Sequence, residues 1–102
     1  MNRHEIISAD ELDGYVHRNG VLIIDLRSRE EFEQSHIAGA VNISYDDFDE
    51  SIPLPRNKLL VLYCDRGSAS LAKGRELVEE GYRVQSVAGG IHAYRGKYLV
   101  RE

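Results

Sequence analysis

The single cysteine, Cys64, has the chemistry of a nucleophile. It follows the apolar run Leu59–Tyr63, which is typical of a buried strand, and precedes a helix expected to begin near Ala69. The backbone N–H groups in the first turn of a helix lack partners and, with the helix dipole, favour a negative charge. Thiols at such places ionise readily, and the thiolate is the reactive form. The sequence therefore indicates Cys64 as a candidate nucleophile.

The loop after Cys64 bears directly on that hypothesis. Gly67 allows the loop to curl so that successive amides face inward as an anion-binding nest. Arg66 adds a positive charge near this nest or is an ordinary solvated arginine. Asp65 opposes ionisation of the thiol unless its carboxylate points away. The alternative for Cys64 is an inert buried thiol, because free cysteines are among the most buried residues.

A second polar group, Asp25 and Arg27, follows the apolar run 21–24. In parallel α/β sheets ligands bind beyond the carboxyl ends of the strands, so this pair and Cys64 are expected at one edge. The two residues either line the site or form an internal ion pair that fixes the loop.

The elements that must position these residues alternate between strand and helix. The runs 21–24 and 59–63 are continuous rather than alternating, which is typical of strands buried on both faces of a parallel sheet. Shorter strands are expected at 6–7, 40–43 and 84–87. Ser-x-x-Glu capping boxes at Ser8 and Ser28 predict helices over about 9–18 and 29–34.

Further helices are expected over about 69–80, with Leu71, Gly74 and Val78 on one face, and from Ile91 through Leu99. A helical turn is expected over 45–50. The alternation predicts an α/β domain with a mainly parallel sheet.

Composition sets limits on partners and compartment. The 102 residues, 42% hydrophobic and 29% charged, suit one domain spanning 1–102. Thirteen basic and 17 acidic residues give a net charge of −4, which argues against a nucleic-acid partner. No apolar run approaches the roughly 20 residues of a membrane span, and no signal peptide is evident, so we expect a cytoplasmic protein without a membrane partner.

One cysteine excludes an intrachain disulfide. His4, His17 and His92 lack metal-ligand spacing, so neither a metal nor a cofactor is expected.

Three segments match the motifs of a known family. They are IIDLRSREEFEQSHIAGAVNIS at 23–44, LLVLYCDRGSAS at 59–70 and VAGGIHAYRG at 87–96. In this order and spacing the chain resembles a single-domain rhodanese, a persulfide-forming sulfurtransferase. The resemblance implies a five-stranded parallel sheet flanked by helices.

The resemblance also implies a two-step reaction. Cys64 would take the outer sulfur of a small anionic donor, such as thiosulfate, a polysulfide or a persulfide. A thiol, possibly a protein thiol, or cyanide would then remove that sulfur. Asp25 and Arg27 would support the site. The loop that would bind the substrate comprises Asp65, Arg66, Gly67, Ser68, Ala69 and Ser70.

Two departures from the family pattern affect the expected substrate and the local turn. Ala69 stands where Arg or Lys is common, so thiosulfate turnover is expected to be weak unless Arg66 substitutes. Ser35 replaces the usual glycine before His36, for which we expect a structural hydrogen-bonding role.

Two other functions stay open. A phosphatase or arsenate reductase uses a similar loop, but it needs an arginine six positions after the cysteine, where Ser70 stands. A sulfur-relay or protein-binding module without efficient turnover is the stronger alternative.

Overall fold

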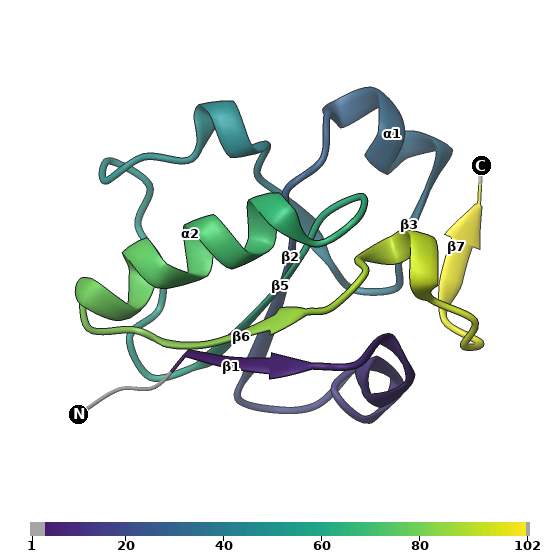
Figure 1. Ribbon diagram of the computed structural model, residues 1–102, viewed down its shortest axis with the longest axis horizontal. Helices are drawn as coiled ribbons and strands as arrows, with labels where there is room; N and C mark the ends of the chain where they lie inside the picture. Colours follow the sequence, from purple (N-terminus) through teal and green to yellow (C-terminus); the bar gives the residue numbers. More distant parts are fainter. Residues whose placement is uncertain (1–3, 102) are drawn as a thin grey trace.

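The computed structural model describes residues 4–101. Five parallel strands form the central sheet in the order β1-β6-β5-β2-β4, and β3 pairs antiparallel with β7 beside it (Figure 1). The α/β class with a five-stranded parallel sheet and flanking helices is thus confirmed. The strands of the large sheet are β1 (His4–Ile7), β2 (Val21–Asp25), β4 (Val41–Asn42), β5 (Leu59–Tyr63) and β6 (Arg83–Val87). The small sheet consists of β3 (Ser35–Ile37) and β7 (Leu99–Arg101).

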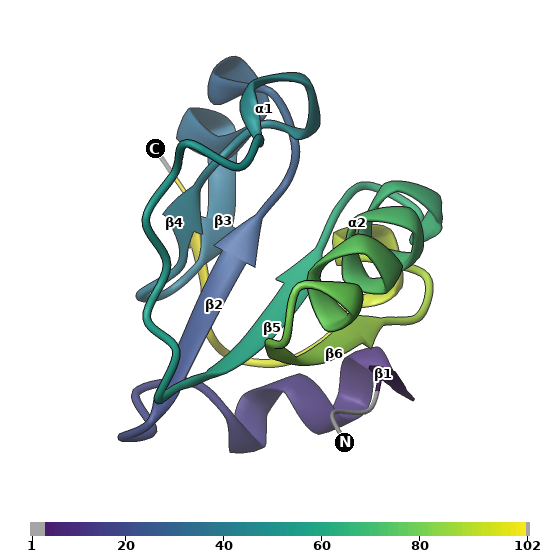
Figure 2. The same cartoon turned by 90° about the vertical axis from the view of Figure 1, so that its left-hand side faces the viewer.

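Hydrophobic cores lie on both faces of the sheet, which explains the continuous apolar strands. In β5, Val61 and Tyr63 pack into one core while Leu60 and Leu62 pack into the other. Figure 2 shows helix α2 (Ser68–Glu79) on one side of the sheet and the 3₁₀ helix η1 (Ala9–Gly14) on the other. A strand covered on both faces has no solvent side on which polar residues could alternate.

The remaining short elements connect the strands. Helix α1 spans Arg29–Gln34, and the 3₁₀ helices η2 and η3 span Tyr45–Asp47 and Ile91–Ala93. The capping box before α1 is present: Glu31 N–H donates to Ser28 Oγ at 3.2 Å, and Ser28 N–H donates to Glu31 Oε1 at 3.1 Å. None of the helices within residues 4–101 is long and apolar enough to cross a membrane.

Two expected helices differ in the structure. The helix expected over 9–18 is the 3₁₀ helix η1, which stops at Gly14; glycine is a poor helix former, and His17 then takes a positive φ of 59°. The helix expected from Ile91 through Leu99 ends at Ala93. Leu99 instead begins β7, because β3 offers it an antiparallel partner far away in the sequence.

The buried face of α2 also differs from the expectation. Leu71 and Val78 are only partly buried, whereas Ser70, Lys73, Gly74 and Leu77 are buried. The Lys73 ammonium is accommodated because it donates to the Phe48 carbonyl at 3.0 Å and pairs with Glu76. The buried side of the helix is therefore partly polar.

Candidate active site

Cys64 stands immediately beyond β5, with 5% of its surface exposed. The backbone N–H of Gly67 donates to its Sγ at 3.0 Å. Gly67 is the N-cap of α2 and has a φ of 111°, a left-handed conformation that glycine adopts without strain. The loop thus folds back over the sulfur, with at least one amide aimed at it.

The segment at Gly90 binds the outer side of the same loop. Ile91 N–H donates to the Cys64 carbonyl at 2.9 Å, and His92 N–H donates to the Asp65 carbonyl at 3.1 Å. A Cβ on Gly90 would collide with the Cys64 carbonyl oxygen and lie 2.6 Å from that of Asp65. Glycine at position 90 therefore allows this segment and the cysteine loop to approach each other closely, backbone against backbone. The two hydrogen bonds fix the direction of the Cys64 and Asp65 carbonyls.

A cavity of about 320 Å³ opens over Cys64. Of the six loop residues expected to bind substrate, four line the cavity: Asp65, Arg66, Ser68 and Ala69. Gly67 instead contacts the sulfur, and Ser70 is fully buried with its hydroxyl on the Gly67 carbonyl. The cavity is also lined by three residues that were not among the expected site residues, Leu26, Ser28 and Glu31. These residues follow the carboxyl end of β2, and that position alone could have indicated that they lie near a ligand site.

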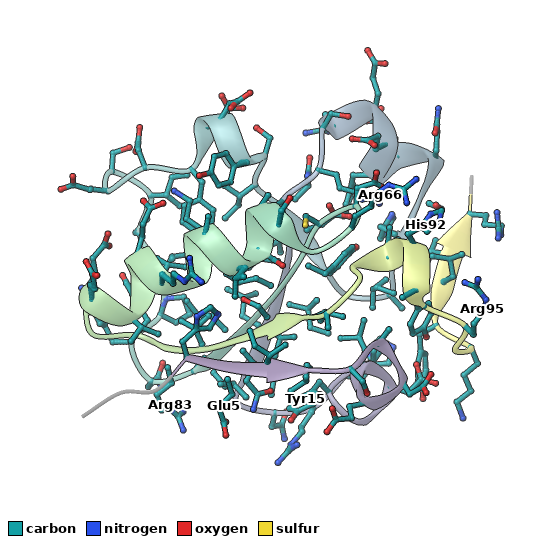
Figure 3. The ribbon with its side chains drawn as sticks, viewed as in Figure 1. Glu5, Tyr15, Arg66, Arg83, His92 and Arg95 are labelled. Carbon is teal, nitrogen blue, oxygen red and sulfur yellow. The ribbon has the colours of Figure 1, made fainter. Side chains whose placement is uncertain are left out.

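The charges around the cavity nearly cancel. Its lining carries two arginines, Arg27 and Arg66, and two carboxylates, Glu31 and Asp65. Arg66 Nε lies 3.9 Å from the Asp65 carboxylate, and both side chains are mostly exposed, so this ion pair contributes little to stability. Figure 3 shows Arg66 extending outward from the loop. The cavity therefore offers a dianion only weak net attraction.

Asp25 and Arg27 form a buried ion pair beside the cavity. Asp25 is fully buried and accepts from the Arg27 backbone N–H and from its guanidinium Nη2, each at 2.8 Å. The same Nη2 donates to the Ser35 carbonyl at 2.5 Å. Burial opposes the charge on Arg27, but the hydrogen bond and the negative charge of Asp25 raise its pKa. Arg27 thus holds β2 against β3 and also lines the cavity.

Tyr63 completes this network. Its hydroxyl accepts the Ile37 N–H at 3.1 Å, and its ring is fully buried. Burial first, and then the neighbouring Asp25 carboxylate, raise the pKa of Tyr63, so the phenol stays neutral. The Tyr63 carbonyl accepts the Leu26 N–H at 2.9 Å. The ends of β2 and β5, which carry Asp25 and Cys64, are thereby tied together.

Ser35 and His36 are the first two residues of β3. His36 Nδ1 lies 2.8 Å from the Phe32 carbonyl, and its ring stacks on Phe32. This is the structural hydrogen bond expected for it. Ser35 has a φ of −165°, extended backbone that any residue adopts, which explains why glycine is not needed there. Among residues 4–101, no three His, Cys, Asp or Glu side chains are grouped so as to hold a metal ion.

Comparison with known proteins places this geometry in a family. Residues 8–97 match the model of the rhodanese-like domain. The chain is 43% identical over 74 residues to a tRNA sulfurtransferase of Desulfurococcus amylolyticus, covering 72% of this chain but only 15% of that protein. It is 29% identical to a thiosulfate sulfurtransferase GlpE of Coxiella burnetii, covering 81% of this chain and 79% of the relative.

The fold agrees with the same family. The crystal structure of a rhodanese-like domain protein from Staphylococcus aureus superposes with a TM-score of 0.83 at 26% identity, covering 96% of this chain and 98% of the other. The family model covers most of the chain, and relatives in both comparisons carry the same domain or a sulfurtransferase name. The chain belongs to the rhodanese-like domain family.

Proposed function

We propose that the protein is a sulfurtransferase that carries sulfane sulfur as a persulfide on Cys64. The observation that carries this proposal is the Gly67 N–H aimed at Sγ at 3.0 Å, at the edge of a cavity of about 320 Å³. An N–H donor at this distance stabilises negative charge on the sulfur as it attacks a donor or leaves the persulfide. The sulfurtransferase names of two relatives support the same reaction class.

The reaction proceeds by two displacements at sulfur. The Cys64 thiolate attacks the outer sulfur of the donor, a new S–S bond forms, and the donor's own bond to that sulfur breaks. The donor leaves with the electron pair, as sulfite from thiosulfate or as a thiolate from a persulfide. An acceptor thiolate then attacks the outer sulfur of the Cys64 persulfide, and the Cys64 thiolate is released. No external oxidant or reductant is needed.

The loop residues have distinct roles in this proposal. The backbone amides from Asp65 to Ser70 hold the thiolate and the terminal sulfur, and the Gly67 N–H on Sγ supports this role. The fixed carbonyls of Cys64 and Asp65 keep the loop in this orientation. Asp25 and Arg27 support the loop from β2.

The charges around the cavity favour particular donors. Thiosulfate is a dianion, and Ala69 supplies no cation while Asp65 offsets Arg66. A persulfide brings a single negative charge to the sulfur, and a polysulfide spreads its charge along the chain, so both depend less than thiosulfate on a cation in the lining. We therefore propose a persulfide or polysulfide as the better donor and a small or protein thiol as the acceptor. Such chemistry suits a reducing compartment such as the cytoplasm.

The test is a donor panel with intact mass spectrometry as the readout. The protein is incubated separately with thiosulfate, polysulfide and glutathione persulfide, and the product is then mixed with a thiol acceptor. We expect the mass of one added sulfur on Cys64, lost again on addition of the acceptor. Cys64→Ser should take up no sulfur while keeping the circular dichroism spectrum of the parent. Absence of an adduct with every donor contradicts the proposal.

The panel, extended by an aryl phosphate, also separates the two alternatives. A relay or binding module would form the persulfide but would not turn over with small acceptors. A phosphatase would release phosphate from an aryl phosphate. Ser70 disfavours the phosphatase, because it occupies the position of the required arginine and its hydroxyl is committed to the Gly67 carbonyl.

A further inference from the structure

A line of hydrogen bonds connects the edge strand β1 to the Cys64 loop. His4 Nε2 lies 2.8 Å from Ser86 Oγ, and Ser86 Oγ lies 2.7 Å from the Ser70 carbonyl oxygen. Ser70 Oγ in turn donates to the Gly67 carbonyl at 3.0 Å. Ser70 and Ser86 are 0% and 2% exposed. The line ends at the residue whose N–H contacts the sulfur.

The direction of each bond in this line is fixed by chemistry. A carbonyl can only accept, so the single hydroxyl proton of Ser86 goes to Ser70. Ser86 Oγ must then accept from His4, whose proton lies on Nε2. Burial, and then the nearby Arg75, lower the pKa of His4. A protonated ring would donate from Nε2 as well, so titration of His4 does not break the line.

Close packing makes the line possible. In Figure 1, β1 and β6 run side by side along the sheet, with α2 packed across it. Gly74 lies in α2 directly against His4 and Ser86. A Cβ there would lie 2.8 Å from Ser86 Oγ and 2.7 Å from His4 Cε1. Glycine at this position lets the helix come close enough for Ser86 to reach the Ser70 carbonyl.

The line holds the first turn of α2 at both of its ends. The Gly67 carbonyl receives the Ser70 hydroxyl and also the Leu71 N–H at 3.1 Å. Two hydrogen bonds from within the helix thus fix the orientation of this carbonyl. The bond from Ser86 to the Ser70 carbonyl anchors the first turn of α2 to the sheet. Rotation of this turn would change the direction of the Gly67 N–H, which is bonded to Cys64 Sγ.

We propose that Ser86, held by His4, is a positioning residue for the Cys64 loop. It acts through Ser70 and Gly67 and sets how well the amide N–H meets the sulfur. This inference rests on the proposed function for its effect on sulfur transfer. Its effect on the reactivity of the thiol can be measured independently of that function.

The test compares the Ser86→Ala variant with the parent protein by two measurements. The first is the rate of Cys64 alkylation by iodoacetamide as a function of pH, and the second is the single-turnover rate of persulfide formation from polysulfide. We expect the alkylation profile to move to higher pH and persulfide formation near pH 7 to slow about threefold to tenfold, the factor of one neutral hydrogen bond. The charged groups that face Cys64, namely Arg27, Glu31, Asp65 and Arg66, are the same in both proteins.

Variants at His4 keep the test decisive if Ser86→Ala does not fold. His4→Leu removes the donor, and we expect the same direction of change with a smaller size. His4→Gln restores an N–H donor and should recover most of the parental profile. Gln85→Ala is the matched control, since Gln85 lies in the same strand but bonds to Glu5 instead. We expect its alkylation profile to match that of the parent.

The outcomes distinguish positioning from a merely structural role. If Ser86→Ala or His4→Leu lowers the urea midpoint but leaves both the alkylation profile and the persulfide rate unchanged, the inference is wrong. The same conclusion follows if His4→Gln behaves like His4→Leu. If the parent forms no persulfide at all, the proposed function fails, and the alkylation profile alone still decides the positioning role.

Discussion

Gly67 donates its backbone N–H to Cys64 Sγ at 3.0 Å, three residues along the chain. The bond needs a left-handed φ at Gly67, and a Cβ at this position would lie 3.0 Å from the Gly89 nitrogen. Gly89 and Gly90 belong to the segment that binds the other side of the loop. The cysteine loop and the glycine pair therefore fit each other as two backbones in direct contact, without side chains between them.

The first prediction concerns this contact. Gly90→Ala places a Cβ against the Cys64 and Asp65 carbonyls, at a φ of 59° and ψ of −158° that side chains rarely adopt. We expect a loss of about 1–3 kcal/mol in the free energy of unfolding and a persulfide-forming rate at least tenfold lower. Urea denaturation and a single-turnover assay measure the two effects.

Gly14→Ala is the control for that substitution. Its Cβ would meet no atom within 4 Å, and its backbone does not take a positive φ. We expect unfolding and sulfur transfer to match those of the parent. A Gly90→Ala protein that retained parental activity would show that the two backbones have room to separate.

The second prediction concerns donor charge. Ala69→Arg adds a cation to the lining of the cavity over Cys64. One added charge near the protein surface is worth about 1 kcal/mol or more, so kcat/KM for thiosulfate should rise at least about fivefold. Persulfide and polysulfide donors, which depend less on a cation at this place, should gain less. The gain should shrink at high ionic strength, because salt screens exposed charges.

Ala72→Arg tests whether position matters for that gain. It adds the same charge to the same helix at a residue that does not line the cavity. We expect little change in thiosulfate kinetics. Equal rates for the Ala69→Arg variant and the parent would refute the charge argument made for this cavity.

The third prediction concerns the buried ion pair. Asp25→Asn leaves the Arg27 guanidinium buried without its negative partner. Removing one member of such a pair costs about 3–5 kcal/mol in stability. The urea midpoint should fall accordingly. Glu33→Gln, which breaks the exposed pair with Arg29, should change stability by less than about 1 kcal/mol. Similar losses of stability in the two variants would contradict the conclusion that burial makes the Asp25–Arg27 pair the more important one.

The fourth prediction concerns alkaline pH. Burial first, and then the hydrogen bond to Asp13, raise the pKa of Tyr94 to about 12 from an ordinary value of 10.0. The folded protein therefore holds this proton more tightly than the unfolded chain does. The resulting stabilisation is complete below pH 10 and is lost as the pH rises towards 12.

Tyr94→Phe should consequently reduce the fall in stability between pH 10 and 12. Its stability at pH 8 should also be lower, because Tyr94 bonds to Asp13 and accepts the Tyr98 N–H at 2.8 Å. Urea denaturation at several pH values measures both effects. Tyr45→Phe, on an exposed ring, is the control and should keep the parental alkaline dependence. Equal pH dependence in the parent and Tyr94→Phe would contradict the prediction.

Local patterns in the sequence were enough to predict the elements that depend on neighbouring residues, namely the buried strands and the capped helix α1. The apolar runs of β2 and β5 identify buried parallel strands because both faces of the sheet are covered. The Ser28 capping box predicts α1 because its two hydrogen bonds lie within four residues. The position of Cys64 between strand and helix, and the family motifs around it, likewise lie in short stretches of sequence.

Only the tertiary structure decided which distant residues meet. Leu99–Arg101 became a strand because β3 supplies the partner, and α2 buries Lys73 because its ammonium finds an acceptor in the distant Phe48 carbonyl. The same holds around the cysteine. Sequence patterns pointed to a nucleophile in a loop able to curl, but the His4–Ser86–Ser70 line joins residues up to 82 positions apart. Local spacing cannot reveal such contacts, because they form only when the strands and α2 pack together.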